Sequence, residues 1–139
     1  MIVGSAILVA IALVVGAVLL SHKGSTKDGT TCQAWTQTRL ALRAVPPLPD
    51  GWNWNTPNID TVIKFQNGPV GFALDQFEPH IAPTPADVAQ AATDYVIARR
   101  KQMNSLATRT YQPDDGATVD SALDRLNQLC GIPGNSRPA

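Results

Sequence analysis

The side chains best suited to acid–base chemistry lie in two short stretches of this sequence. Asp75 and Glu78 stand close to His80, and Asp114 and Asp115 are adjacent. Carboxylates and imidazole can exchange protons with a substrate when they share a cavity. The second pair sits in a Pro-Asp-Asp-Gly turn, where acids are usually solvated or cap a helix. Acid–base catalysis would therefore require the first three side chains to converge in one pocket, and we expect a protein that is not an enzyme.

Metal and cofactor chemistry also has few candidate residues. The chain contains two histidines, His22 and His80, and two cysteines, Cys32 and Cys130. If the cysteines are paired, a single histidine in the folded part cannot complete a zinc ligand set. No nucleophile-elbow, phosphate-binding or dinucleotide-binding glycine motif occurs. Eleven basic and eleven acidic residues balance, so no net field favours nucleic acid. We expect no metal, cofactor or nucleic-acid partner.

The two cysteines bracket most of the chain that follows the first thirty residues. An isolated pair at the two ends of a domain is typical of a disulfide, and disulfides persist in exported proteins. Two unrelated buried thiols are the alternative. Closing so long a loop would stabilise the fold by roughly 4–5 kcal/mol. We expect a Cys32–Cys130 disulfide and a mainly helical domain closed by it.

Residues 1–22 have the composition of a membrane anchor. From Ile2 to Leu20 every side chain is apolar or small, and the first charge is Lys23. A helix of this length is about 30 Å long, the thickness of the hydrocarbon core of a bilayer. The missing basic n-region and the poor cleavage site favour an uncleaved anchor over a signal peptide. We therefore expect one span of the inner membrane.

The side of the membrane on which the domain lies is predicted differently by two signals. Lys23 and Lys27 follow the span, and positive charge favours the cytoplasmic side. The cysteine pair favours the periplasmic, or extracytoplasmic, side. We expect the domain to lie on the extracytoplasmic side.

Small residues form two stripes along the predicted anchor. Such stripes let helices approach closely in lipid, although alanine and glycine are also common in any span. Two stripes suit a helix that wedges between the helices of a larger membrane protein. The first stripe contains Ala6, Ala10 and Ala17, and the second contains Ser5, Ala12 and Gly16.

Beyond the anchor, the sequence predicts a polar linker (23–30), a helical domain (31–132) and a short C-terminal tail (133–139). Within the domain, apolar spacing predicts a helix from Cys32, capped by Thr31, to about Val45, and a long helix over 85–108. A last helix, capped by Thr118, carries an apolar stripe that ends at Gly131.

Residues 57–78 allow two interpretations. Thr56 and Pro57 resemble a helix start, and Ile59, Val62 and Ile63 have helical spacing. The Asn-Gly pair at 67–68 is instead typical of a hairpin turn. Pro69 directly after that pair favours the helix, and the alternatives remain open.

Two groups of side chains are candidates for contact with a partner. Trp52 and Trp54 lie in a proline-rich crossover, where they either fill a small core or form an interface. Arg99, Arg100 and Lys101 form a basic cluster on the long helix, either as a solvated face or as a contact with lipid headgroups or an acidic surface.

The apolar anchor, the Ala/Pro/Thr/Asp-rich domain, the terminal cysteine pair and the run VPPLPDGW at 45–52 resemble small single-pass envelope proteins of mycobacteria and other actinobacteria. That resemblance implies an accessory or assembly subunit of a large inner-membrane complex, such as an MCE-type lipid transporter or a respiratory supercomplex. The alternative is a membrane-tethered module that binds lipid or cell-wall material. Its expected ligand site is an apolar groove near Phe65, Phe72 and Phe77.

Overall fold

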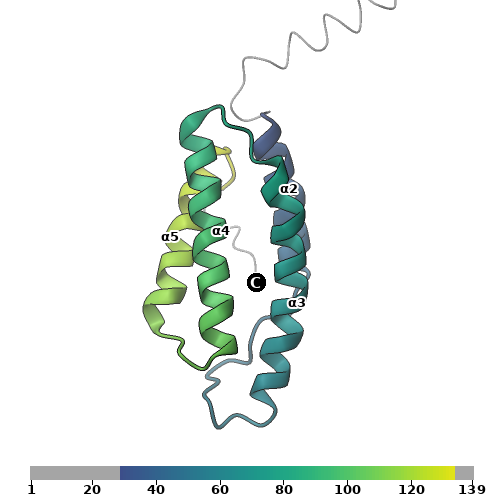
Figure 1. The fold of residues 1–139 in the computed structure, drawn as a ribbon, viewed down its shortest axis with the longest axis vertical. Coiled ribbons are helices and arrows are strands. Elements are labelled where there is room, and N and C mark those ends of the chain that lie inside the picture. Colours follow the sequence, from purple (N-terminus) through teal and green to yellow (C-terminus); the bar gives the residue numbers. More distant parts are fainter. Residues whose placement is uncertain (1–28, 134–139) are drawn as a thin grey trace, which may run out of the picture.

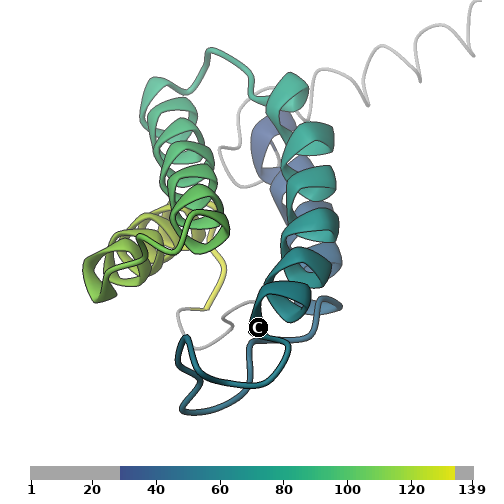
Figure 2. The ribbon, with the colours of Figure 1, turned by 60° about the horizontal axis from the view of Figure 1, so that its bottom comes forward.

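The computed structural model of the protein describes residues 29–133. In this range the chain forms four α-helices and no strand, which confirms the mainly helical class that the sequence predicted. The helices run alternately in opposite directions as two antiparallel pairs, α2 with α3 and α4 with α5 (Figures 1 and 2). They are α2 (Thr30–Arg43), α3 (Ile59–Phe77), α4 (Ala86–Ala107) and α5 (Pro113–Leu129), with the short 3-10 helix η2 (Glu78–His80) between α3 and α4.

The predicted anchor, its two small-residue stripes and residues 134–139 lie outside the described residues. Across residues 29–133, none of the helices is both long and apolar enough to cross a membrane.

The core lies between the helix pairs and is centred on Trp35, whose side chain is fully buried. Its ring contacts Tyr95 of α4 and Phe77 of α3, with ring centroids 4.8 Å and 5.4 Å away. Its indole N–H donates to Oδ1 of Asn127 on α5 at 2.9 Å. One residue of α2 therefore contacts all three other helices. Its two aromatic contacts and its paired indole N–H make a stable centre for the core.

The predicted disulfide is present and joins the first turn of α2 to the end of α5. Cys32 and Cys130 have Cα atoms 5.4 Å apart and are separated by 98 positions in the sequence. Both residues are buried against the main core. The Trp35–Asn127 hydrogen bond lies three residues further along α2 and three residues back along α5. The first and last helices are thus held in an antiparallel register by two consecutive links.

Helix α3 decides the ambiguity over residues 57–78, and the hairpin interpretation is wrong. The helix continues through Asn67, Gly68 and Pro69 to Phe77. Pro69 lies on the exposed side of α3, so the carbonyl of Phe65 that lacks a donor because of the proline faces outward, where water can reach it. The Asn-Gly turn signal is overridden because α3 buries Ile63, Val70 and Leu74 at helical spacing.

Two predicted helix caps are wrong. Helix α2 begins before Thr31, whose hydroxyl accepts a hydrogen bond from the backbone N–H of Ala82 at 2.9 Å. Helix α5 begins at Pro113, well before Thr118, because a proline in the first turn followed by two acids suits a helix start. The stop at Gly131 is confirmed, since this residue has φ +69° and the N–H of Ile132 donates to the carbonyl of Asn127.

The start of α5 is held by Asp115. Its carboxylate accepts a hydrogen bond from the backbone N–H of Gln112 at 3.0 Å, and Nζ of Lys101 lies 3.6 Å away. The hydrogen bond from Gln112 is the main reason that the pKa of Asp115 lies below its ordinary value, and Lys101 adds to the effect. Asp115 therefore stabilises the fold in its ionised form.

A pH dependence follows from this lowered pKa. The stabilisation by Asp115 is complete above the ordinary carboxyl pKa of about 4 and is lost as the pH falls through the lower, folded-state value. We expect Asp115→Asn to lower the melting temperature near pH 7 and the difference from wild type to shrink in acid. The exposed Asp120 on the same helix gives the control, Asp120→Asn. A difference between wild type and Asp115→Asn that stays constant from pH 7 to pH 2 would contradict this assignment.

Candidate functional site

A groove with a volume of about 730 Å³ lies between the outer sides of α2 and α3. Alanines on both helices leave room between them, and Phe72 forms one wall. Thr30, the first residue of α2, lies at one end of the groove, so the groove begins where the preceding part of the chain enters the domain. Its lining consists of Thr30, Gln33, Ala34, Gln37, Thr38, Ala41, Pro69, Phe72, Ala73, Gln76 and His80.

The groove lining contains no Asp, Glu, Lys or Arg. Its polar groups are amides, hydroxyls and the His80 imidazole. A ligand or partner with a charged face would lose its hydration here without gaining an ion pair. The lining therefore favours an apolar or uncharged occupant.

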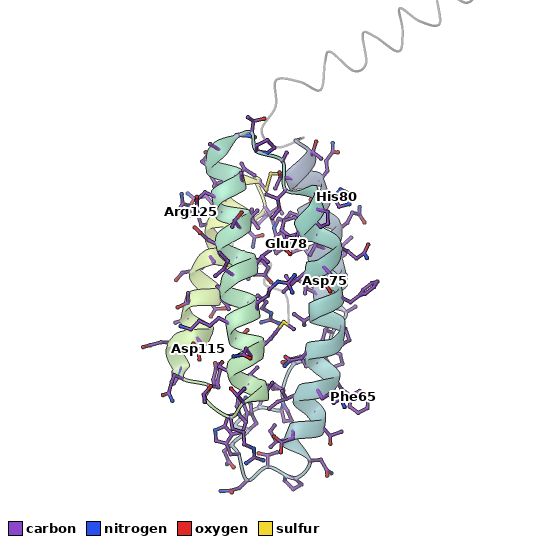
Figure 3. The ribbon with its side chains drawn as sticks, in the orientation of Figure 1. Phe65, Asp75, Glu78, His80, Asp115 and Arg125 are labelled. Carbon is purple, nitrogen blue, oxygen red and sulfur yellow. A yellow bond between two sulfur atoms is a disulfide. The ribbon has the colours of Figure 1, made fainter. Side chains whose placement is uncertain are left out.

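Large apolar side chains are exposed along the same helix pair. Phe65 is 76 % exposed, Phe72 is 66 % exposed and Leu40 is 56 % exposed. Figure 3 shows Phe65 extending outward from α3, away from α4 and α5. Several large apolar side chains exposed on one helix pair favour an interaction site, whereas a single exposed apolar residue is ordinary. Among the described residues, the only other large exposed apolar side chain is Ile97 on α4.

The expected groove near three phenylalanines is present in part. Phe72 lines it and Phe65 lies seven residues before Phe72 on the same helix. Phe77 does not take part, because it is buried in the core against Trp35. The three positions cannot share one face, since Phe77 follows Phe72 by five residues and points to another side of the helix.

Trp52 and Trp54 belong to the loop between α2 and α3. This loop lies at the opposite end of the bundle from the start of α2 (Figure 1). The two tryptophan rings meet edge to face with centroids 5.0 Å apart, and Trp52 also contacts Tyr111. Both tryptophans pack on a second small core that contains Ile59, Ile63 and Leu106. They are half-buried, so these side chains close the end of the bundle while part of each remains exposed.

Arg109 contacts both Trp54 and Asp60 at this end of the bundle. Its guanidinium lies 5.5 Å from the centroid of the Trp54 ring and hydrogen-bonds to the carboxylate of Asp60, with Nε donating to Oδ1 at 3.1 Å. This hydrogen bond holds the pKa of Asp60 below its ordinary value.

The predicted basic cluster is divided among three surroundings. Successive residues of a helix point about 100° apart, so the three side chains diverge. Arg100 binds Asp75 and Glu78 of the α3–η2 segment at 2.9 Å and 3.0 Å. Lys101 faces Asp115, whereas Arg99 lines a smaller cavity near Trp52.

The candidate acid–base cluster is also divided. Arg100 donates hydrogen bonds to the carboxylates of Asp75 and Glu78. The bond to Asp75 is the main reason that the pKa of this guanidinium is raised. His80 lines the groove, whose lining includes neither carboxylate. Figure 3 shows Asp75, Glu78 and His80 at successive levels of the α3–η2 segment. The two carboxylates therefore act as an ion-pair clamp between α3 and α4.

Within residues 29–133, no three His, Cys, Asp or Glu side chains gather as metal ligands. The chain matches no protein-family model, no curated protein and no solved structure. The candidate site therefore has to be argued from its own geometry.

The α2 side of the groove was missed by the sequence reasoning. Ala34, Gln37 and Ala41 recur at helical spacing on a face that lies roughly 100° around the helix from Trp35 and Leu42. This uncharged stripe of small and amide side chains was a usable signal, because an exposed helix face in a soluble protein ordinarily carries charge.

Proposed function

We propose that this protein is a non-enzymatic accessory or assembly subunit of a membrane complex, anchored by its N-terminal segment, with its helical domain on the extracytoplasmic side. The observation that carries the proposal is the uncharged groove between α2 and α3, with exposed Phe72 in its lining and exposed Phe65 and Leu40 on the same two helices. Such a face suits a partner helix that lays apolar side chains into the groove.

Two further features support this assignment. The Cys32–Cys130 disulfide fits an oxidising, extracytoplasmic compartment. The groove starts at Thr30, directly after the linker that follows the apolar segment. A partner helix that leaves the same membrane beside the anchor would therefore meet the groove first.

The test is an affinity purification of the tagged full chain from native membranes in mild detergent. We expect wild-type protein to recover membrane partners in fixed stoichiometry. Phe72→Glu should reduce their recovery at least roughly tenfold, because it puts a charge into an apolar contact centre. Phe72 is 66 % exposed, so the substitution leaves the core intact.

The matched control is Ile97→Glu, which adds the same charge at a residue that is 61 % exposed on α4, outside the groove. This variant should recover the partners as wild type does. Equal losses in both variants would contradict the groove as the docking surface. Wild-type protein that emerges without partners would contradict the subunit function itself.

A lipid or cell-wall ligand is the second candidate function, because the groove has the volume and apolar lining of many ligand sites. In that case wild-type protein purified without partners should release a stoichiometric lipid on organic extraction. Phe72→Glu should release at least roughly tenfold less, and Ile97→Glu an unchanged amount.

A further inference from the structure

A second, smaller cavity of about 210 Å³ lies where α3, α4 and the aromatic end of the bundle meet. One cation, Arg99, lines it together with the amide side chains of Gln66 and Gln102. Trp52, Tyr111 and Leu106 supply aromatic and aliphatic walls. The cavity is separate from the groove between α2 and α3, with which it shares no lining residue.

Arg99 differs from the other arginines of this region in having no carboxylate partner among residues 29–133. Arg100 holds Asp75 and Glu78, and Arg109 holds Asp60. The Nη1 atom of Arg99 donates to Oε1 of Gln102 at 2.6 Å. Its Nε atom is buried without any hydrogen-bond partner in the described part of the chain. A guanidinium that lacks a carboxylate partner gains from an anion placed beside its remaining N–H groups.

The chemistry of the lining selects the ligand. A guanidinium presents its N–H groups as a planar fork that matches a carboxylate, and the amides of Gln66 and Gln102 offer additional N–H donors. The aromatic and aliphatic walls suit a short apolar stem attached to the anion. The cavity is small, about 210 Å³, which favours a ligand with a short stem.

We propose that the Arg99 cavity binds a small organic carboxylate, with the guanidinium of Arg99 on the carboxylate and the apolar stem against Trp52 and Tyr111. The carboxylate belongs either to a free short-chain acid or to an acidic side chain of a partner protein. The proposal is independent of the groove and of the function proposed above.

The experiment titrates the purified full chain in mild detergent with sodium butyrate at constant ionic strength. Tryptophan fluorescence reports binding because Trp52 lines the cavity. We expect a saturable change that weakens at least roughly tenfold in Arg99→Gln, since one charge-assisted bidentate contact is lost. Arg125→Gln, at an exposed position of α5, should titrate as wild type does.

Arg99→Lys keeps the positive charge but loses the planar fork of the guanidinium, so this variant should also bind butyrate more weakly than wild type. It replaces Arg99→Gln in the titration if that variant fails to fold. N-acetylglutamate N-methylamide presents the same carboxylate from a peptide backbone. Saturation by this probe indicates a partner's side chain as a source, whereas saturation by butyrate alone indicates a free acid.

Three results would overturn the proposal. They are the absence of saturation by either probe, equal affinity of Arg99→Gln and wild type for butyrate, and inorganic phosphate binding as tightly as butyrate.

Discussion

Replacing Cys32 and Cys130 together by alanine is expected to lower the free energy of unfolding by about 4–5 kcal/mol. The disulfide links positions 98 residues apart, and cross-linking so long a loop removes much of the conformational entropy of the unfolded chain. The effect is a large part of the 5–15 kcal/mol by which single domains are usually stable. Urea unfolding of the full chain in mild detergent, followed by tryptophan fluorescence, gives the measurement.

The control for this result is a reducing agent. It should destabilise the wild-type chain by about the same 4–5 kcal/mol and leave the double variant unchanged, because only the disulfide responds to it. A double variant as stable as wild type would show that the α2–α5 contacts close the fold without the covalent link.

Trp35→Ala is expected to cost about 3–5 kcal/mol, the range for deleting a large buried aromatic side chain. Trp35 is fully buried and contacts Tyr95, Phe77 and Asn127, each on a different helix. The surrounding helices cannot all move inward, because the disulfide holds α2 against α5. The same urea titration, followed by circular dichroism because a tryptophan is lost, measures the difference.

The contribution of the Trp35–Asn127 hydrogen bond can be measured separately from that of the buried ring by a smaller substitution. Trp35→Phe keeps an aromatic ring but leaves Oδ1 of the buried Asn127 without its donor, which costs about 1–3 kcal/mol. Adding Asn127→Leu should restore part of that loss, because it removes the orphaned amide, whose Nδ2 atom already lacks a partner among the described residues. A further loss in the double variant would mean that shape, and not the hydrogen bond, dominates at this site.

The sequence by itself determined the helical class, the disulfide and most of the core. Cys32, Trp35 and Leu42 on the first helix and Val119, Leu123 and Leu126 on the last recur at helical spacing, and all six are buried. These features are local or periodic, so a single helix displays them before it meets its neighbours. The stop of α5 at Gly131 was predictable for the same reason, because only the local backbone has to accept a positive φ.

The tertiary structure alone decided how polar side chains were used. Arg99, Arg100 and Lys101 are one cluster in the sequence but reach three surroundings, because each faces a different neighbour of α4. Asn127 lies in the buried stripe of α5, and its Oδ1 atom accepts a hydrogen bond from an indole 92 positions away. The contacts that a polar side chain makes depend on the partner within its reach. Helix packing, and not local spacing in the sequence, brings that partner close.

The groove between α2 and α3 and the Arg99 cavity were likewise decided only by the tertiary structure. Each needs helices at a given separation and in a given register, which no one-dimensional pattern contains. Alanine at positions 34, 41 and 73 signals only a small side chain. It lines a groove because α2 and α3 pack side by side with these small side chains along the line where the two helices meet. The shape and lining of these two hollows are therefore set by helix packing. The helices that make this packing possible are set by the sequence.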